Sequence, residues 1–167
     1  MASALDAIVP RRANNDYRGG AIAFYGFSLL VAERIFSATV HFLTPDGGKN
    51  SIASIIVFEG DPDPNPIVYM FASIAGAHEM LFVLLYGLVL WRYRNLIPLM
   101  LTLMLVGMAF GVVASTLHPL TPDYFERTPP AMLVRVPMFL FIGTLLFLAV
   151  RQSSKPRVGP EAGPATG

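Results

Sequence analysis

The sequence contains no cysteine. This absence excludes a disulfide-stabilised scaffold, a thiol redox enzyme and a metal site built from cysteine. Charge is also scarce, because Asp, Glu, Lys and Arg make up only 14% of the 167 residues, against about a quarter in soluble domains. Such a chain cannot cover a water-facing surface of its own size, which excludes a soluble globular protein and a disordered one. A net charge of +1 provides no basic face, so we expect no nucleic-acid partner.

Apolar side chains are in excess, at 54% of the chain. A transmembrane helix needs about 20 predominantly apolar residues, and four stretches satisfy this requirement: Ala21–Leu43, Ile67–Trp91, Leu96–Leu117 and Ala131–Val150. The sequence therefore predicts an all-α membrane protein, with four transmembrane helices arranged as two tandem hairpins in the lipid bilayer. Residues 1–20 are expected to form a cytoplasmic tail, 21–150 the bundle, and 151–167 a disordered cytoplasmic tail.

Basic residues are distributed unequally between the two sides of the predicted bundle. One side has only Lys49 and Arg127, whereas the other has Arg11, Arg12, Arg18, Arg92, Arg94, Arg151, Lys155 and Arg157. Because Lys and Arg are concentrated in cytoplasmic segments, both termini are predicted in the cytoplasm, and the protein in a bacterial inner membrane. A cleavable signal peptide over the first span is the alternative, but it would leave three spans with a mismatched charge distribution.

The first outer loop, Thr44–Pro66, is long and contains the apolar run Ile52–Phe58. A run this short cannot span a bilayer, so we expect an interfacial strand or half-helix over the end of the bundle. The segment Asp61–Pro66 that follows is expected to be extended, because each residue before a proline disfavours the helical region.

A nine-residue repeat closes the first and third predicted spans. Ala38–Asp46 and Ser115–Asp123 match at six positions, with His, Leu, Thr, Pro and Asp in the same order. A duplicated hairpin, with its copies related by an axis along the membrane normal, would produce this pattern.

The repeat has two interpretations. His41, Asp46, His118 and Asp123 are residues that favour helix ends and the turns after them, so they can be helix punctuation. Alternatively, the two histidines face each other, and either hold a metal with the two aspartates or ligate a haem. Because no third ligand lies close in sequence, we predict no metal and no cofactor, with haem at His41 and His118 as the alternative.

Ionisable residues lie near the centre of the first two predicted spans. At 1.5 Å per residue, Arg34 lies about 14 Å and Glu79 about 18 Å from the outer ends of their helices. Glu33 and His78 lie at similar depth. Two charges at the centre of the first span cost about 5 to 7 kcal/mol, so we expect this helix to be held inside a bundle.

The residues around these charges indicate how the two helices face each other. Glu79 shares its helix face mainly with small residues, as a close helix contact requires, namely Ala72, Ala75 and Gly76. Arg34 lies at helical spacing from Ser37, Ala38 and His41. Both faces are therefore predicted to point into the bundle, with Arg34 paired to Glu79.

The intramembrane charges have a structural and a functional interpretation. Glu33, Arg34, Glu79 and Arg135 sum to zero charge, so they can form a purely structural network. Arg135 lies near the outer end of its span and can extend toward water. Ionisable groups in membranes also serve as proton or ion sites. His78 is the residue that the structural network explains least, since histidine titrates near neutrality.

The third predicted span has two regular stripes. Met100, Met104 and Met108 suggest cuprous copper in another setting, but no second Met cluster faces them, so we interpret them as packing residues. Gly107, Gly111 and Ser115 form a ridge of small residues, which is a packing signal within the bundle or between protomers.

The basic turn Arg92–Pro98 leads directly into the third span. With the length and the four spans, this layout resembles small bacterial four-helix inner-membrane proteins that are DoxX-like in outline. The resemblance covers the second and third spans and implies a class of protein, not an activity. The cysteine pair expected of a thiol-relay relative is absent, and no catalytic residue is carried over.

Three functions follow as hypotheses. The first is a structural or accessory membrane subunit that associates with itself or with a larger complex through the small-residue ridge. The second is a small proton-coupled transporter using Glu79, His78, Arg34 and Glu33. The third is a membrane haem protein. No nucleophile elbow, phosphate-binding loop or zinc motif is present in the sequence, so we do not predict an enzyme.

Overall fold

The computed structural model describes residues 4–154, which are mostly helical. The elements are α1 (Ala4–Ile8), α2 (Ala21–Leu43), α3 (Asn65–Arg92), the 3-10 helix η1 (Arg94–Leu96), α4 (Ile97–Leu117), the 3-10 helix η2 (Pro122–Tyr124) and α5 (Pro130–Ser153). Helices α2, α3, α4 and α5 are each long and apolar enough to cross a membrane. The all-α class and the four predicted spans are therefore confirmed, and the architecture is that of a multi-pass membrane protein.

The start of α3 differs from the prediction. The helix begins at Asn65, so Pro66 lies in its first turn, where the missing N–H of proline leaves no helix bond unmade. The segment expected to be extended up to Pro66 therefore ends earlier, and Pro64 already has helical backbone angles. Asn65 fixes this start by bonding to Phe58, accepting from its N–H at 3.0 Å and donating to its carbonyl at 2.7 Å.

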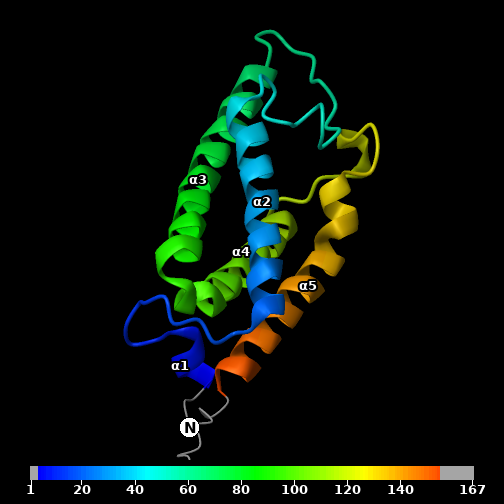
Figure 1. Cartoon of the computed structure of the whole chain (residues 1–167). Helices are drawn as coiled ribbons and strands as arrows, with labels where there is room; N and C mark the ends of the chain where they lie inside the picture. Colours follow the sequence, from blue (N-terminus) through cyan, green and yellow to red (C-terminus); the bar gives the residue numbers. More distant parts are fainter. Residues whose placement is uncertain (1–3, 155–167) are drawn as a thin grey trace, which may run out of the picture.

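The four long helices meet at the end of the molecule that carries the N-terminus, the α3–α4 connection and the end of α5, called here the terminus end (Figure 1). The hydrophobic core lies here, and Phe27 of α2 contacts Tyr86 of α3 edge to face at 5.9 Å. Around this pair pack Leu30, Val31, Val89, Ile97, Met100, Leu101, Met104, Ile142 and Leu145. The core thus joins all four long helices over only part of their length.

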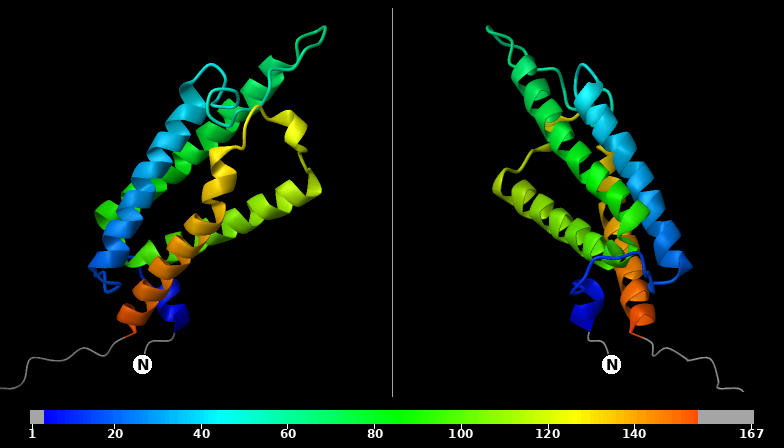
Figure 2. Two further views of the ribbon diagram at one scale, coloured as in Figure 1. Left: turned by 90° about the vertical axis from the view of Figure 1, so that its right-hand side faces the viewer. Right: turned by 60° about the vertical axis from the view of Figure 1, so that its left-hand side comes forward.

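Toward the opposite end, called the loop end, α4 diverges from the α2–α3 pair, as the left view of Figure 2 shows, and α5 diverges from it in Figure 1. The buried residues of α4 all lie between Ile97 and Met104, and those of α5 between Ile142 and Ala149. The halves of α4 and α5 nearer the loop end are mostly exposed. One hairpin, α2–α3, is therefore closely packed along its length, whereas the other is open.

Two loops meet at the loop end. Ile55 and Phe125 form an isolated antiparallel bridge, and the N–H of Glu126 donates to the Ser54 carbonyl at 2.8 Å. The Arg127 Nε also donates to the Ser54 hydroxyl at 2.8 Å. The run Ile52–Phe58, expected to be a strand or half-helix, is turn and irregular backbone with this one bridge, because only Ile55 has a β partner among the described residues.

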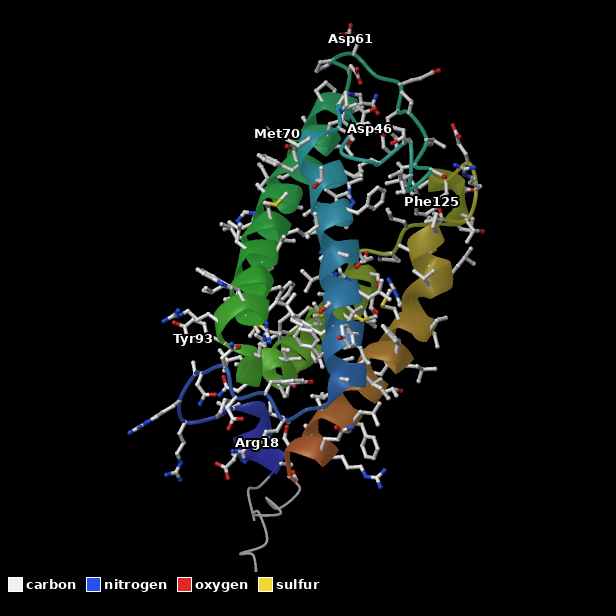
Figure 3. All side chains as sticks on the ribbon, viewed as in Figure 1. Arg18, Asp46, Asp61, Met70, Tyr93 and Phe125 are labelled. Atoms are coloured by element: carbon white, nitrogen blue, oxygen red, sulfur yellow. The ribbon has the colours of Figure 1, made fainter. Side chains whose placement is uncertain are left out.

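Residues 4–20, called here the N-terminal strap, fold against the terminus end rather than extending as a free tail. The Asn14 N–H donates to the Asn95 side chain at 2.8 Å, and the Asn95 amide donates to the Arg12 carbonyl at 2.8 Å. Arg18 and Tyr93 lie at this end of the molecule, opposite Asp46 and Phe125 (Figure 3). Within the predicted cytoplasmic tail 1–20, residues 4–20 therefore have a defined structure that packs on the helices. At the other terminus α5 continues to Ser153, and the tail predicted beyond it lies mostly outside the described residues.

Candidate intramembrane site

The contact between α2 and α3 depends on small side chains. A Cβ atom on Gly76 would lie 2.6 Å from the backbone carbonyl carbon of His41, so only glycine allows this approach. Ala38 of α2 is fully buried and Ala72 of α3 nearly so. The close helix contact predicted from the small residues beside Glu79 is present, and it brings polar side chains of the two helices within hydrogen-bonding distance.

Glu79 of α3 bonds to two polar side chains of α2. The Ser37 hydroxyl donates to Glu79 Oε2 at 3.2 Å, and His41 Nδ1 lies 3.3 Å from the same oxygen. His41 and Ser37 are one helical turn apart, so both reach the same carboxylate. No described residue donates a hydrogen bond to the other oxygen, Oε1, and about a third of the Glu79 side chain is uncovered by protein. One carboxylate oxygen is therefore available.

Arg34 pairs differently from the prediction. Its Nε lies 3.2 Å from Oε2 of Glu33, the preceding residue on α2. Glu79 lies beyond ion-pair distance of Arg34 and is bonded to His41 and Ser37 instead. The predicted Arg34–Glu79 pair is therefore wrong as a direct contact. The local reason is that Glu33 is a neighbour in sequence, so its carboxylate reaches the guanidinium without any helix rearrangement.

Arg34 and Glu79 nonetheless line the same pocket. Its volume is about 360 Å³, and α4 closes one side of it. The two charged residues share it with two aromatic residues of α3 and four residues of α4, namely Phe82, Tyr86, Leu103, Met104, Gly107 and Met108. The pocket exists because α4 leaves the α2–α3 pair just beyond the core. It combines a carboxylate and a guanidinium with largely apolar walls near the middle of two membrane-crossing helices.

His78 and Arg135 lie apart from this group. The His78 side chain is exposed, and its Nδ1 bonds to the Ile74 carbonyl of its own helix at 2.7 Å. Arg135 is exposed on the open half of α5 and does not line the pocket. The predicted four-residue neutral cluster is therefore not assembled. Glu33 and Arg34 form an ion pair, and Glu79 is bonded to His41, with Arg34 as a further positive charge in the same pocket.

The two copies of the repeat have different structures. His41 lies inside α2, whereas His118 follows the last residue of α4 and is exposed. The difference follows from Pro119, which stands where the first copy has Phe42, because a residue before proline disfavours helical angles. The ends of α2 and α4 lie apart in both views of Figure 2. The structure thus does not bring the two histidines face to face.

The two aspartates of the repeat also differ. Asp46 accepts hydrogen bonds from the backbone N–H groups of Gly48, Asn50 and Ser51 at 2.8 to 3.1 Å. Burial raises the pKa of this carboxyl, but the backbone donors outweigh burial and lower the pKa to about 2. Asp123 accepts from the Thr121 hydroxyl at 3.3 Å. Among residues 4–154 no group of three His, Asp or Glu side chains is placed to hold a metal ion.

The small-residue ridge of α4 is open. A Cβ atom at Gly107 or Gly111 would have nothing within 4 Å, and Ser115 is exposed with its hydroxyl bonded to the Val112 carbonyl of its own helix. The ridge is therefore not a packing surface within the described chain. Of the methionine stripe, Met100 and Met104 belong to the core, as expected of packing residues.

The sequence indicated some of the site and not the rest. Ser37 and His41 share the face of Arg34, so helical spacing placed them toward α3 without identifying Glu79 as their partner. Phe82 and Leu103 carried no signal, because apolar side chains in membrane helices are equally suited to lipid contact. Met104, Gly107 and Met108 were predicted as packing residues and not as pocket lining.

Comparisons with known proteins give no match: no family model, no curated protein and no solved structure is significantly similar to this chain.

Proposed function

We propose that this chain is a structural or accessory membrane subunit that associates laterally, in the simplest case with a second copy of itself. The observation that carries the proposal is the open half of α4. A Cβ atom added to Gly107 or Gly111 of the ridge would have nothing within 4 Å. Helix association in lipid depends on small residues that let backbones approach closely. A glycine ridge with open space in front of it suits contact with another helix.

The charge distribution supports the same proposal. Glu33 lies near the middle of α2, and 43% of its side chain is uncovered by protein. A carboxylate facing lipid at this depth costs about 2.5 to 3.5 kcal/mol. Its pairing with Arg34 reduces this cost, and a neighbouring subunit would remove more of it.

The association is tested by the Gly111→Leu variant, measured by single-molecule photobleaching in lipid nanodiscs and by chemical cross-linking. We expect the wild type to be oligomeric and Gly111→Leu to shift toward monomer. Gly87→Leu is the matched control. A Cβ atom added to Gly87 of α3 would also have nothing within 4 Å, but Gly87 does not belong to the ridge. A wild type that is monomeric at every protein-to-lipid ratio would refute self-association.

A second candidate is the proton-coupled transporter, now centred on Glu79 and His41 with Arg34 and Glu33 beside them. The observation that favours it is the pocket at Glu79, because a carboxylate and a histidine lie 3.3 Å apart at its wall. Proton uptake into proteoliposomes containing a pH-sensitive dye tests it, with Glu79→Gln expected to abolish uptake.

For the orientation we propose that the terminus end faces the cytoplasm of a bacterial inner membrane. The support is that Arg11, Arg12, Arg18, Arg92, Arg94 and Arg151 are clustered in segments at this end (Figure 1), in agreement with the positive-inside rule.

A further inference from the structure

We propose that the pocket at Glu79 binds a hydrophobic organic ammonium ion. The first argument is the available acceptor. Both hydrogen bonds to Glu79 reach Oε2, and Oε1 belongs to a carboxylate that lines the pocket. A carboxylate oxygen in a membrane interior without a donor is unfavourable unless a cation or proton occupies the space before it.

The second argument is the charge around this oxygen. On α2, Glu33 and Arg34 form an ion pair at 3.2 Å and together contribute no net charge. His41 contributes a positive charge only when protonated. The lining residues of α4 are Leu103, Met104, Gly107 and Met108, none of which is ionisable. The charged lining residues are Arg34 and Glu79, and Glu33 is bonded to Arg34. With His41 neutral, these three side chains together carry one net negative charge, and a monovalent cation neutralises it.

The third argument is the chemistry of the walls. Phe82 and Tyr86 of α3 line the pocket with Glu79, and the centroids of their two rings lie 6.3 Å apart. Aromatic faces attract ammonium groups, most strongly away from water. The two methionines supply adaptable apolar surface. An ammonium group with an apolar substituent matches these features, whereas a small hydrated metal ion would leave the apolar walls uncovered.

The same charge balance predicts competition with protons. A proton taken up by the His41–Glu79 pair supplies the positive charge that the ammonium ion would otherwise supply. Of the other ionisable residues on α2 and α3, Glu33 is bonded to Arg34, Tyr86 is packed in the core, and His78 faces away. We therefore expect binding to weaken as the pH falls. The binding proposal does not depend on lateral association.

The experiment measures binding of benzyltrimethylammonium to the full chain in nanodiscs by saturation-transfer NMR, with empty nanodiscs subtracted. This quaternary ion does not titrate, so any pH dependence belongs to the protein. We expect Glu79→Gln to weaken binding at least about thirtyfold and Phe82→Leu about three- to tenfold. Arg135→Gln is the control and should retain binding, because Arg135 is charged and exposed but does not line the pocket.

Phenylmethanesulfonate, an anion with the same ring, is the matched probe. If it binds and the ammonium ion does not, Arg34 rather than Glu79 governs the pocket and the proposal is overturned. Equal binding of the ammonium ion to wild type, Glu79→Gln and Phe82→Leu also overturns it. Should Glu79→Gln fail to fold, Phe82→Leu and the pH dependence still decide, because neither requires a substitution at Glu79. Binding that persists in Gly111→Leu separates this proposal from the proposed association.

Discussion

Gly76 is the residue that allows the two polar helices to meet. The α2 backbone occupies the space that a side chain at this position would need. Because Glu79 lies one turn further along the same face of α3, this close approach also brings its carboxylate within reach of Ser37 and His41. The geometry of the candidate site is therefore a consequence of a missing side chain rather than of the charged residues alone.

The first prediction compares two glycines of α3. Gly76→Ala forces α2 and α3 apart and should destabilise the protein by about 1 to 3 kcal/mol, as overpacking does. Gly87 has open space where a Cβ atom would lie. Gly87→Ala should therefore stabilise the protein by up to about 1 kcal/mol, because alanine has the higher helix propensity. Thermal unfolding in a fixed detergent, followed by circular dichroism, measures both. Equal effects of the two substitutions would contradict the close contact at Gly76.

The second prediction concerns Asp46. Its folded pKa of about 2 lies below the ordinary value of 3.8, so its stabilising contribution is present above pH 4 and is lost as the pH falls through about 2. Asp46→Ala should lower stability by about 1 to 3 kcal/mol at neutral pH, because three backbone donors lose their acceptor. Asp123→Ala is the control and should change stability much less. The comparison uses thermal unfolding at pH 7 and pH 3.

At the scale of elements, the N-terminal strap is the part of the structure that periodicity did not reveal. It is held by polar contacts of Asn14, Asn95 and Arg12, which have no repeating pattern in the sequence. The four spans, by contrast, follow directly from long apolar runs, and α2 has the predicted bounds. Helix α4 ends at Leu117, as predicted, but earlier in the repeat than α2 does. This end follows from Pro119, a local signal that also explains why the repeated histidines are not equivalent.

The third prediction concerns Tyr17 of the strap. Its hydroxyl is buried and has no hydrogen-bond partner among the described residues, and burial raises its pKa to about 12. Tyr17→Phe keeps the ring contact with Phe24 and removes the unsatisfied group, so stability should rise by about 1 kcal/mol. Thermal unfolding at neutral pH measures this gain, and a loss of stability would show that the hydroxyl has a partner.

The raised pKa of Tyr17 also predicts how the free energy of unfolding changes with pH. Because the folded pKa exceeds the ordinary value of 10.0, the contribution of Tyr17 to stability is present below pH 10 and is lost as the pH rises through about 12. The Tyr17→Phe variant should lack this alkaline loss, which a comparison of unfolding at pH 8 and pH 11 measures.

At the scale of the whole molecule, the protein has one closed hairpin and one open hairpin. The inner packing of all four long helices lies near the terminus end, and the ridge of α4 has open space in front of it. Composition predicted the membrane class because a chain with so few charges has no other way to be covered. It could not predict that the second hairpin opens, because helix separation depends on side-chain packing that apolar sequences do not specify uniquely.

The fourth prediction tests the orientation. Since the sequence contains no cysteine, Ser51→Cys and Ser154→Cys provide single labels at opposite ends of the molecule. A membrane-impermeant maleimide added to intact cells should label Ser51→Cys and leave Ser154→Cys unlabelled until the membrane is permeabilised. The reverse pattern would place the terminus end outside.

The contact between His41 of α2 and Glu79 of α3 joins polar side chains of the two helices, and a double-mutant cycle between these residues measures its strength. Unfolding free energies are measured for wild type, His41→Ala, Glu79→Gln and the double variant. We predict a coupling energy of about 0.5 to 2 kcal/mol, in the range of interhelical hydrogen bonds in membranes. Additive effects, within about 0.3 kcal/mol, would contradict this contact.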